Sequence, residues 1–254
     1  MSTDDPTRRD ALAGIAATGV ALLAGCPSQR PTPTTTTAPT TGGTMSQTAL
    51  AGNHTVVPLP FKPGSLDGLS ERLITSHHEN NYGGAVKNLN KVELELAKIT
   101  KDTPPFAVAA LRDRELTFRN SKNLHEAYFG NLGGNGKLGG AIEKALAQAY
   151  GSIAAWETQF RGTAMGLGGG SGWAVLGLEL DTGGLRTVGS GNHTQTLSTG
   201  APLLVLDMYE HSYHLDFGAG HAKYIDAFFK NVSWDEVSRR LDRALAASKT
   251  LRGA

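Results

Sequence analysis

Four residues that lie far apart in the chain carry donor atoms that one metal ion could share: His77, His125, Asp207 and His211. Asp207 and His211 stand four positions apart, so both side chains can turn toward one point if the backbone there is helical or opens into a helix. Three neutral imidazoles and one carboxylate suit a first-row transition metal, whereas calcium and magnesium prefer a shell made mostly of oxygen. We therefore expect a transition-metal site if the fold brings the four together.

The elements that must position these donors are mainly helical in the first half of the folded part, roughly residues 50–134. Asp67 or Ser70 can cap a first helix, and the apolar positions that follow have helical spacing. Pro104 and Pro105 break the run, and we expect two further helices, one over about 107–118 and another that contains His125. The pair Gly83-Gly84 predicts close approach by another backbone.

The second half mixes helices with strands. Helices are expected over 138–150, 153–164, 221–231 and 234–251, and strands over 172–180, 185–188 and 203–207, with a turn signal at 181–184 between the first two strands. This order predicts an α+β fold with a small antiparallel sheet of three strands packed by helices. The segment 130–140, rich in Gly and Asn, is the best boundary between the two parts.

The first 26 residues have the features of an export signal. Arg8 and Arg9 precede an apolar run from Ala11 to Ala24, which is too short to span a bilayer comfortably. The paired arginines suggest the twin-arginine route. The run ends Leu-Ala-Gly-Cys, which resembles a bacterial lipobox, so we expect lipidation at Cys26; the alternative is a plain signal peptide with an incidental cysteine. Cys26 is the only cysteine of the chain, which excludes an internal disulfide.

Residues 27–48 consist largely of Thr, Pro, Ser, Gly and Gln. Such a composition has almost nothing apolar to bury, so we expect a disordered tether. With 24 basic and 23 acidic residues the whole chain is close to neutral, and it shows no basic patch of the kind that a nucleic-acid-binding protein needs. We expect four parts: signal 1–26, tether 27–48, helical domain 49–135 and α/β domain 136–254.

Several motifs in the same order resemble the iron/manganese superoxide dismutases. The run 207–213, Asp-Met-Tyr-Glu-His-Ser-Tyr, resembles that family's metal signature D-x-W-E-H-A-Y. Further similar stretches are Val57–Phe61, the two histidines at 77–78 with Val86–Asn90, Phe118–His125, Gly170–Trp173 and Asn231–Trp234. The resemblance implies that His77, His125, Asp207 and His211 bind one manganese or iron ion per subunit. It also implies an N-terminal helical hairpin and a C-terminal α/β domain with the metal between them.

The activity that the resemblance implies is disproportionation of superoxide to dioxygen and peroxide. This reaction needs a metal that takes up and returns one electron, which iron and manganese do and zinc does not. Two other hypotheses remain open from the sequence. The first is an envelope protein on the same fold that binds metal with little or no turnover, and the second is a different reaction at the same site, such as peroxidase-like chemistry.

Groups around the metal depart from the family pattern. His193 stands where many members carry a glutamine that hydrogen-bonds the metal-bound solvent, and Ser121 occupies the alternative glutamine position. The family's gateway tyrosine corresponds to Ala85, and its companion histidine corresponds to Asn81. These two changes remove familiar proton-relay groups and motivate the hypothesis of a metal-binding protein with little or no turnover.

Other side chains could rebuild the relay and wall the site. We expect Tyr82 and His214, together with His193, to act as catalytic proton-relay groups. Trp173, with Tyr209 and Phe129 at positions where tryptophans usually stand, would form an aromatic and mostly dry shell.

The retained pair Glu210-His211 implies an oligomer. In the family this glutamate reaches the partner subunit's last ligand histidine, so we expect a homodimer or a dimer of dimers. With the signal features, the sequence predicts an exported protein at the cell envelope or in the periplasm of a bacterium, held to the membrane through a lipid anchor only.

Overall fold

The computed structural model describes residues 49–253, which belong to one compact unit. The predicted signal peptide, the tether and Cys26 lie outside the described residues. Among residues 49–253, none of the helices combines the length and hydropathy that a membrane crossing requires.

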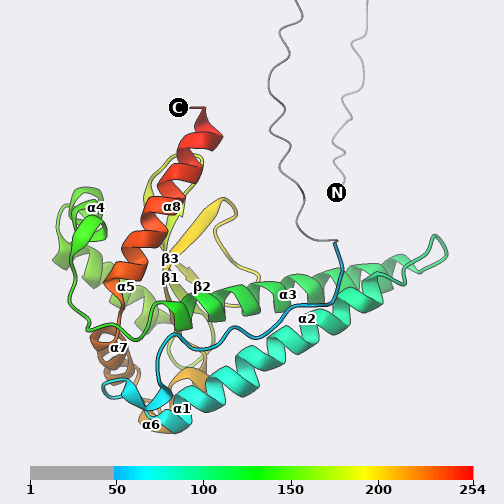
Figure 1. Cartoon of the computed structure of the whole chain (residues 1–254), viewed down its shortest axis with the longest axis horizontal. Coiled ribbons are helices and arrows are strands. Elements are labelled where there is room, and N and C mark those ends of the chain that lie inside the picture. The colour runs from blue at the N-terminus through cyan, green and yellow to red at the C-terminus, as the bar shows by residue number, and fades with distance from the viewer. Residues whose placement is uncertain (1–48, 254) are drawn as a thin grey trace, which may run out of the picture. The chain divides into compact units, whose positions relative to one another are not determined.

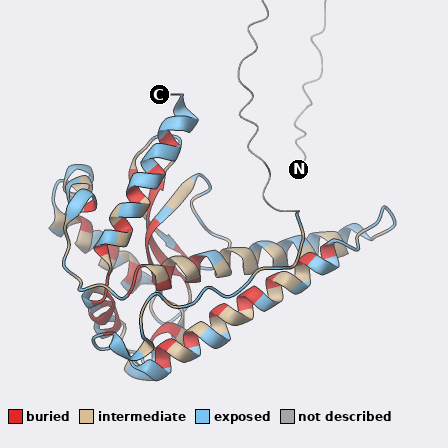
Figure 2. Cartoon of the chain, viewed as in Figure 1, coloured by how far each residue is buried: buried red, intermediate tan, exposed pale blue. Residues whose placement is uncertain are grey.

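A long antiparallel helix pair forms the first half of the unit (Figure 1). After a short turn η1 (Pro63–Ser65), helix α1 (Glu71–Ser76) begins at Ser70, whose Oγ accepts a hydrogen bond from the Leu73 amide at 3.1 Å. The chain continues through a π-helical segment, η2 (His77–Tyr82), into α2 (Gly83–Leu96), and returns as α3 (Pro105–Gly130). Figure 2 shows a buried stripe along the facing sides of this pair.

Helix α3 is one helix of 26 residues, so the expected division into two helices was wrong. The buried residues of its second half continue one helical stripe: Ser121, Leu124, His125, Tyr128 and Phe129. Spacings of three and four residues keep this stripe on a single face, and packing on that face outweighs the polar composition.

The second half is an α/β part. Helices α4 (Gly140–Tyr150) and α5 (Ile153–Leu167) precede the strands β1 (Trp173–Glu179), β2 (Leu185–Ser190) and β3 (Gly200–Asp207). The strands form an antiparallel sheet in the order β2-β1-β3. The chain then passes through η3 (Glu210–Ser212) and α6 (His214–Phe217) and ends in α7 (His221–Lys230) and α8 (Trp234–Arg252). The predicted fold class is confirmed.

The sheet register places two functional residues side by side. Trp173, the first residue of β1, pairs with Asp207, the last residue of β3, and on its other side with Ser190 of β2. The glycine before Trp173 is required because Gly172 has φ 145° and a Cβ there would collide with the Ser190 carbonyl oxygen. The strand ends are thereby fixed at the edge of the sheet that meets α3.

The glycine pair in the first half does not behave as expected at Gly84. A Cβ at Gly84 would meet no other atom within 4 Å, so the predicted close approach is wrong at this position. At Gly83 the nearest atom would be the His78 carbonyl oxygen at 3.5 Å, an ordinary contact. Gly84 instead leaves open space beside α2.

Candidate metal centre

Four different elements supply the four predicted donors. His77 is the first residue of η2, and π-helical turns of this kind are frequent at functional sites. His125 lies on the buried stripe of α3, Asp207 ends β3, and His211 lies in η3. The site therefore joins the helix pair to the end of the sheet.

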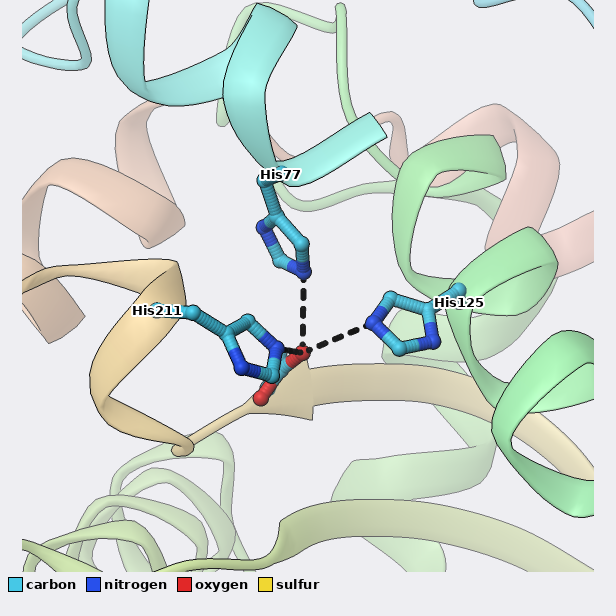
Figure 3. Close-up of side chains that lie close together, drawn as sticks. His77, His125 and His211 are labelled. Carbon is cyan, nitrogen blue, oxygen red and sulfur yellow. Dashed lines mark hydrogen bonds and ion pairs between the residues drawn. The ribbon is translucent and has the colours of Figure 1, made fainter. Parts of the chain in front are cut away.

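The donor atoms converge on one point. One ligand atom from each of the four residues lies within 4.8 Å of the others. Asp207 Oδ2 is 3.1 Å from His77 Nε2, 3.2 Å from His211 Nε2 and 3.5 Å from His125 Nε2. Figure 3 shows the three imidazoles pointing at this carboxylate oxygen. His77 and Asp207 have no exposed surface, and only His211 reaches solvent.

The hydrogen bonding within the cluster indicates that a cation binds there. His125 Nδ1 donates to the Ser121 carbonyl oxygen at 2.7 Å, so in the neutral ring the lone pair is on Nε2. That buried Nε2 has no hydrogen-bond partner and faces a carboxylate oxygen, which is also an acceptor. Unpaired acceptors that face one another are costly in a protein interior, and a metal ion among them removes that cost.

Burial and neighbouring groups favour the protonation states that a metal requires. Burial lowers the pKa of His77, against the opposing effect of Asp207, and it lowers the pKa of His125 to about 3. Burial alone would raise the pKa of Asp207, but the charge and hydrogen bonds of His211 and His77 outweigh it, and the net pKa is lowered. Neutral imidazoles and an ionised carboxylate are the forms that bind metal.

Aromatic rings surround the cluster. The Trp173 ring lies 5.0 Å from His125, and the Phe129 ring lies 4.9 Å from His77. Tyr209 stacks on His211, with ring centroids 5.3 Å apart and planes inclined by 14°. Its backbone amide donates to Asp207 Oδ1 at 2.8 Å, which orients the carboxylate. The walls exclude water from three sides and fix the ligand orientations.

His193 lies beside the cluster, with its ring centroid 6.3 Å from that of His125. Trp173 Nε1 donates to His193 Nδ1 at 3.0 Å, so a neutral His193 carries its proton on Nε2. The ring stacks on Tyr209 at 4.8 Å. Asn120 Nδ2 on α3 donates to the His193 carbonyl oxygen at 2.8 Å and holds the loop after β2 in place.

A pocket of about 280 Å³ leads to the cluster, and His125, His193 and His211 form part of its lining. The side chains of Asn81, Ala85 and Ser121 also line it. Residues 81 and 85 are the two positions at which the family's gateway groups are replaced, and both line the same pocket.

The structure does not bring Tyr82 and His214 to this pocket. Tyr82 Oη donates to Glu126 Oε1 at 2.7 Å, accepts from the Val57 amide at 2.8 Å and lines a separate pocket. His214 is exposed at the start of α6. No hydrogen bond or ring contact among residues 49–253 joins it to the four donors. Glu210 is exposed next to His211, so it is accessible to a second subunit.

Sequence reasoning missed the residues that support the ligands from behind. Tyr224 Oη donates to the Asp207 carbonyl oxygen at 2.8 Å and lies 3.2 Å from Tyr128 Oη. Asn120 was quoted only as part of a motif and was given no role. The helical stripe offered a signal for Tyr128, which stands three residues after His125, whereas Tyr224 is recognisable only once the fold is known.

The helix pair and the α/β part hold a buried cluster of three histidines and one carboxylate between them. This donor set is the kind that metal-binding proteins use for a transition metal. Residues 138–240 match the family model described as "Iron/manganese superoxide dismutases, C-terminal domain". The chain is 46% identical over 189 residues to "Superoxide dismutase [Fe]" of Cupriavidus metallidurans, covering 74% of this chain and 96% of that protein. It is 35% identical to "Superoxide dismutase [Fe]" of Aquifex pyrophilus (76% and 93% covered) and 33% identical to "Superoxide dismutase [Mn] 2" of Haloferax volcanii (74% and 95% covered). The chain belongs to the iron/manganese superoxide dismutase family.

Proposed function

We propose that this chain is a superoxide dismutase that uses one iron or manganese ion per subunit to convert two superoxide ions and two protons to dioxygen and hydrogen peroxide. The observation that carries the proposal is the convergence of His77, His125, Asp207 and His211 on one buried point. The names of the relatives support it, because they include both iron and manganese superoxide dismutases. Those names do not distinguish the two metals for this chain.

The residues of the site would hold such an ion through three neutral Nε2 atoms and the Asp207 carboxylate. When bound, iron or manganese supplies one-electron chemistry by alternating between two oxidation states. Asp207 contributes the one negative charge, and its orientation is fixed by the Tyr209 amide and, through its backbone, by Tyr224. His193 presents an Nε2–H donor because Trp173 occupies its Nδ1. The rings of Trp173, Tyr209 and Phe129 pack against the ligand histidines and exclude water there.

Superoxide loss is the experiment that tests this proposal. The full chain is loaded with iron or with manganese, metal content is measured, and superoxide decay is followed against the free metal ion. Activity above the free ion in at least one form is expected. The proposed enzyme fails if neither form exceeds the free ion while one metal per chain is bound, and the protein would then be a metal-binding protein without turnover, an outcome that Ala85 and Asn81 in the pocket would explain.

A neighbouring pair of histidines gives a matched control for the ligands. His77→Ala should lose the metal and the activity together. His78→Ala should keep both, because His78 Nε2 is bonded to the Val57 carbonyl oxygen at 2.9 Å, outside the cluster. Equal metal content in the two variants would remove His77 from the ligand set.

Location at the cell envelope is part of the proposal and depends on sequence features outside the described residues. The order of paired arginines, apolar run, lipobox-like Cys26 and polar segment supports export and a lipid anchor. Mass spectrometry of the native protein should find a lipid at Cys26 and none in Cys26→Ala. A processed chain without lipid would support the plain signal peptide instead.

A homodimer or a dimer of dimers is proposed from the exposed Glu210 beside the partly exposed His211. A glutamate at that surface can reach an imidazole of a partner subunit. Sedimentation of wild type and Glu210→Gln tests it: the variant should dissociate more readily. A monomeric wild-type protein would refute the proposed assembly.

A further inference from the structure

The pocket in front of the metal cluster has an unusual lining for a site that must supply protons. Apart from the histidines at its inner end, the lining is made of amides, hydroxyls, one phenylalanine and very small side chains. Among the described residues that line it, there is no aspartate, glutamate, lysine, arginine or tyrosine. No carboxyl, amine or phenol of the described chain therefore stands between the cluster and bulk water along this route.

Two helix stripes form the walls. Asn81, Ala85 and Asn88 follow one another at spacings of four and three residues on η2 and α2. Opposite them, Thr117 and Ser121 follow at a spacing of four on α3 and lead to His125. Helical periodicity thus lines up short polar side chains from the surface to a metal ligand.

The space between these stripes is large enough for water. Its volume is about 280 Å³, and a cavity needs only about 10–15 Å³ of such volume to hold one water molecule. Gly84 adds open space, since a Cβ there would meet nothing within 4 Å. The side chains of Asn81 and Asn88 form no hydrogen bond with another residue of the described segment, which leaves their donors and acceptors free for water.

We infer that this pocket is a water-filled vestibule, and that Asn81 and Asn88 are positioning residues for the water chain that delivers the protons of the reaction. The inference rests on the proposed function, in which the second superoxide gains one electron from the reduced ion and two protons from solvent to leave as hydrogen peroxide. Water bonded to the two amides carries those protons inward to the inner end of the pocket, where the Nε2–H of His193 can donate to the last water and orient it. Ordered water molecules thus take the place of a titrating side chain in proton delivery.

The presence of water is tested without any turnover. In the full chain loaded with Mn²⁺, the bound ion accelerates the relaxation of water protons that reach it. Gly84→Leu should fill the vestibule, because a helical leucine leans toward the preceding turn, and should lower the relaxation enhancement several-fold at unchanged manganese content. Gly83→Ala is the control: it changes a glycine of the same helix outside the pocket and should leave the enhancement unchanged. An equal enhancement in Gly84→Leu and wild type would overturn the vestibule.

The role of the amides is tested by kinetics. Asn81→Leu with Asn88→Leu keeps similar volume and removes the water-holding groups. The expected result is a fall in kcat of about a hundredfold, at the low end for loss of proton transfer, with a larger solvent isotope effect and little change in kcat/KM. Raising the concentration of a small buffer acid should restore kcat. Unchanged kcat and isotope effect with metal retained would overturn the positioning role.

The two proposals fail in different ways. If the wild-type protein binds manganese but removes no superoxide, the proposed function and the proton-delivery role fall together, and the relaxation measurement still decides whether the pocket carries water to the ion. If the wild type is active and Gly84→Leu leaves relaxation, kcat and isotope effect unchanged, the enzyme stands and the vestibule is refuted.

Discussion

Two buried polar clusters of this molecule use similar side chains in opposite ways. The metal cluster consists of His77, His125, Asp207 and His211. The second, which we term the Glu93 cluster, consists of His54, Glu93 and Arg119 with the Gly52 amide, and it lies where the N-terminal segment crosses α2. Both contain a buried carboxylate bonded to an imidazole, yet only in one of them is the carboxylate surrounded by donors without an added ion.

In the Glu93 cluster, the buried carboxylate accepts all its hydrogen bonds from groups of the protein itself. The Glu93 carboxylate accepts from the Gly52 amide at 2.8 Å, from His54 Nε2 at 2.8 Å and from an Arg119 nitrogen at 2.6 Å. Asn90 adds two bonds to the His54 backbone, both 2.8 Å long. The buried carboxylate is thus surrounded by donors, and the cluster ties the segment around residues 52–54 to the helix pair.

In the metal cluster, hydrogen-bond acceptors face one another with no donor between them. His125 Nε2 points a lone pair at the Asp207 carboxylate and has no hydrogen-bond partner. Buried polar groups normally find partners. A buried cluster that is complete in itself therefore indicates a structural role, and one that needs a positive charge to become complete indicates a binding site.

The largest expected effect comes from removing the metal. Binding to the folded state alone stabilises by about 4 kcal/mol when free metal exceeds its Kd a thousandfold. Treatment with a chelator should therefore lower the unfolding free energy of wild type by a few kcal/mol, measured by denaturant titration. The same treatment should leave His77→Ala unchanged. A chelator effect of equal size in both would show that the cluster is not where the metal stabilises the fold.

The pH dependence should separate the clusters in the metal-free protein. Burial lowers the pKa of His125 to about 3, so the unfolded state binds a proton that the folded state does not, and stability falls as pH falls from about 6.5 toward 3. Glu93 behaves differently: burial alone would raise its pKa, but His54, the Gly52 amide and Arg119 outweigh burial and lower it. The stability that Glu93 supplies is present above the unfolded value of 4.5 and is lost only as pH falls below it.

Unfolding titrations from pH 7 to pH 4 check this order. Between pH 6.5 and pH 4.5, stability should fall less steeply in His125→Gln than in wild type, while Glu93→Gln should keep the wild-type slope. The remaining slope in His125→Gln is assigned to His77 and His193, whose pKa values burial also lowers. A slope that is lost in Glu93→Gln instead would reverse the comparison.

What the sequence could predict depends on how local each signal is. The strands, the sheet and most helices follow from local patterns, and the Asp207–His211 pair follows from its spacing. The pairing of His77 with Asp207 joins residues 130 positions apart, so only the family resemblance placed them together. Long-range pairing is a property of the fold, and no local pattern contains it.

The proton-relay hypotheses show where spacing misleads. His214 is three residues after His211 and would share its face in a continuous helix, but η3 ends at Ser212 and Tyr213 has φ −145° and ψ −25°, which breaks the helix. Tyr82 follows Asn81 by one residue and so points to another side of its helix, toward Glu126. Their relay roles stay predictions, and the geometry gives them no contact with the pocket.

Replacement of Glu93 tests the structural cluster. Glu93→Gln exchanges a carboxylate, whose side chain is 3% exposed, for an amide that cannot accept from Gly52, His54 and Arg119 with the same strength. Hydrogen bonds to a charged group contribute about 1.5–3 kcal/mol, so a loss of about 2 kcal/mol in unfolding free energy is expected. The loss should be the same with and without metal, and superoxide removal at low temperature should be unchanged. A loss that appears only in the metal-loaded protein would link the two clusters.

The smallest effect concerns a bond at the rim of the metal cluster. Trp173→Phe removes the indole N–H that occupies His193 Nδ1, a hydrogen bond that contributes about 1 kcal/mol and so biases the two neutral tautomers about fivefold. Nitrogen NMR of the zinc-loaded protein, which is diamagnetic, should show His193 protonated on Nε2 in wild type and as a mixture in the variant. Trp234→Phe is the matched control, since Trp234 Nε1 donates to the Gly136 carbonyl oxygen, away from the metal cluster. An unchanged His193 tautomer in Trp173→Phe would show that groups on the metal side set the tautomer. Trp173 would then contribute only packing to the wall of the cluster.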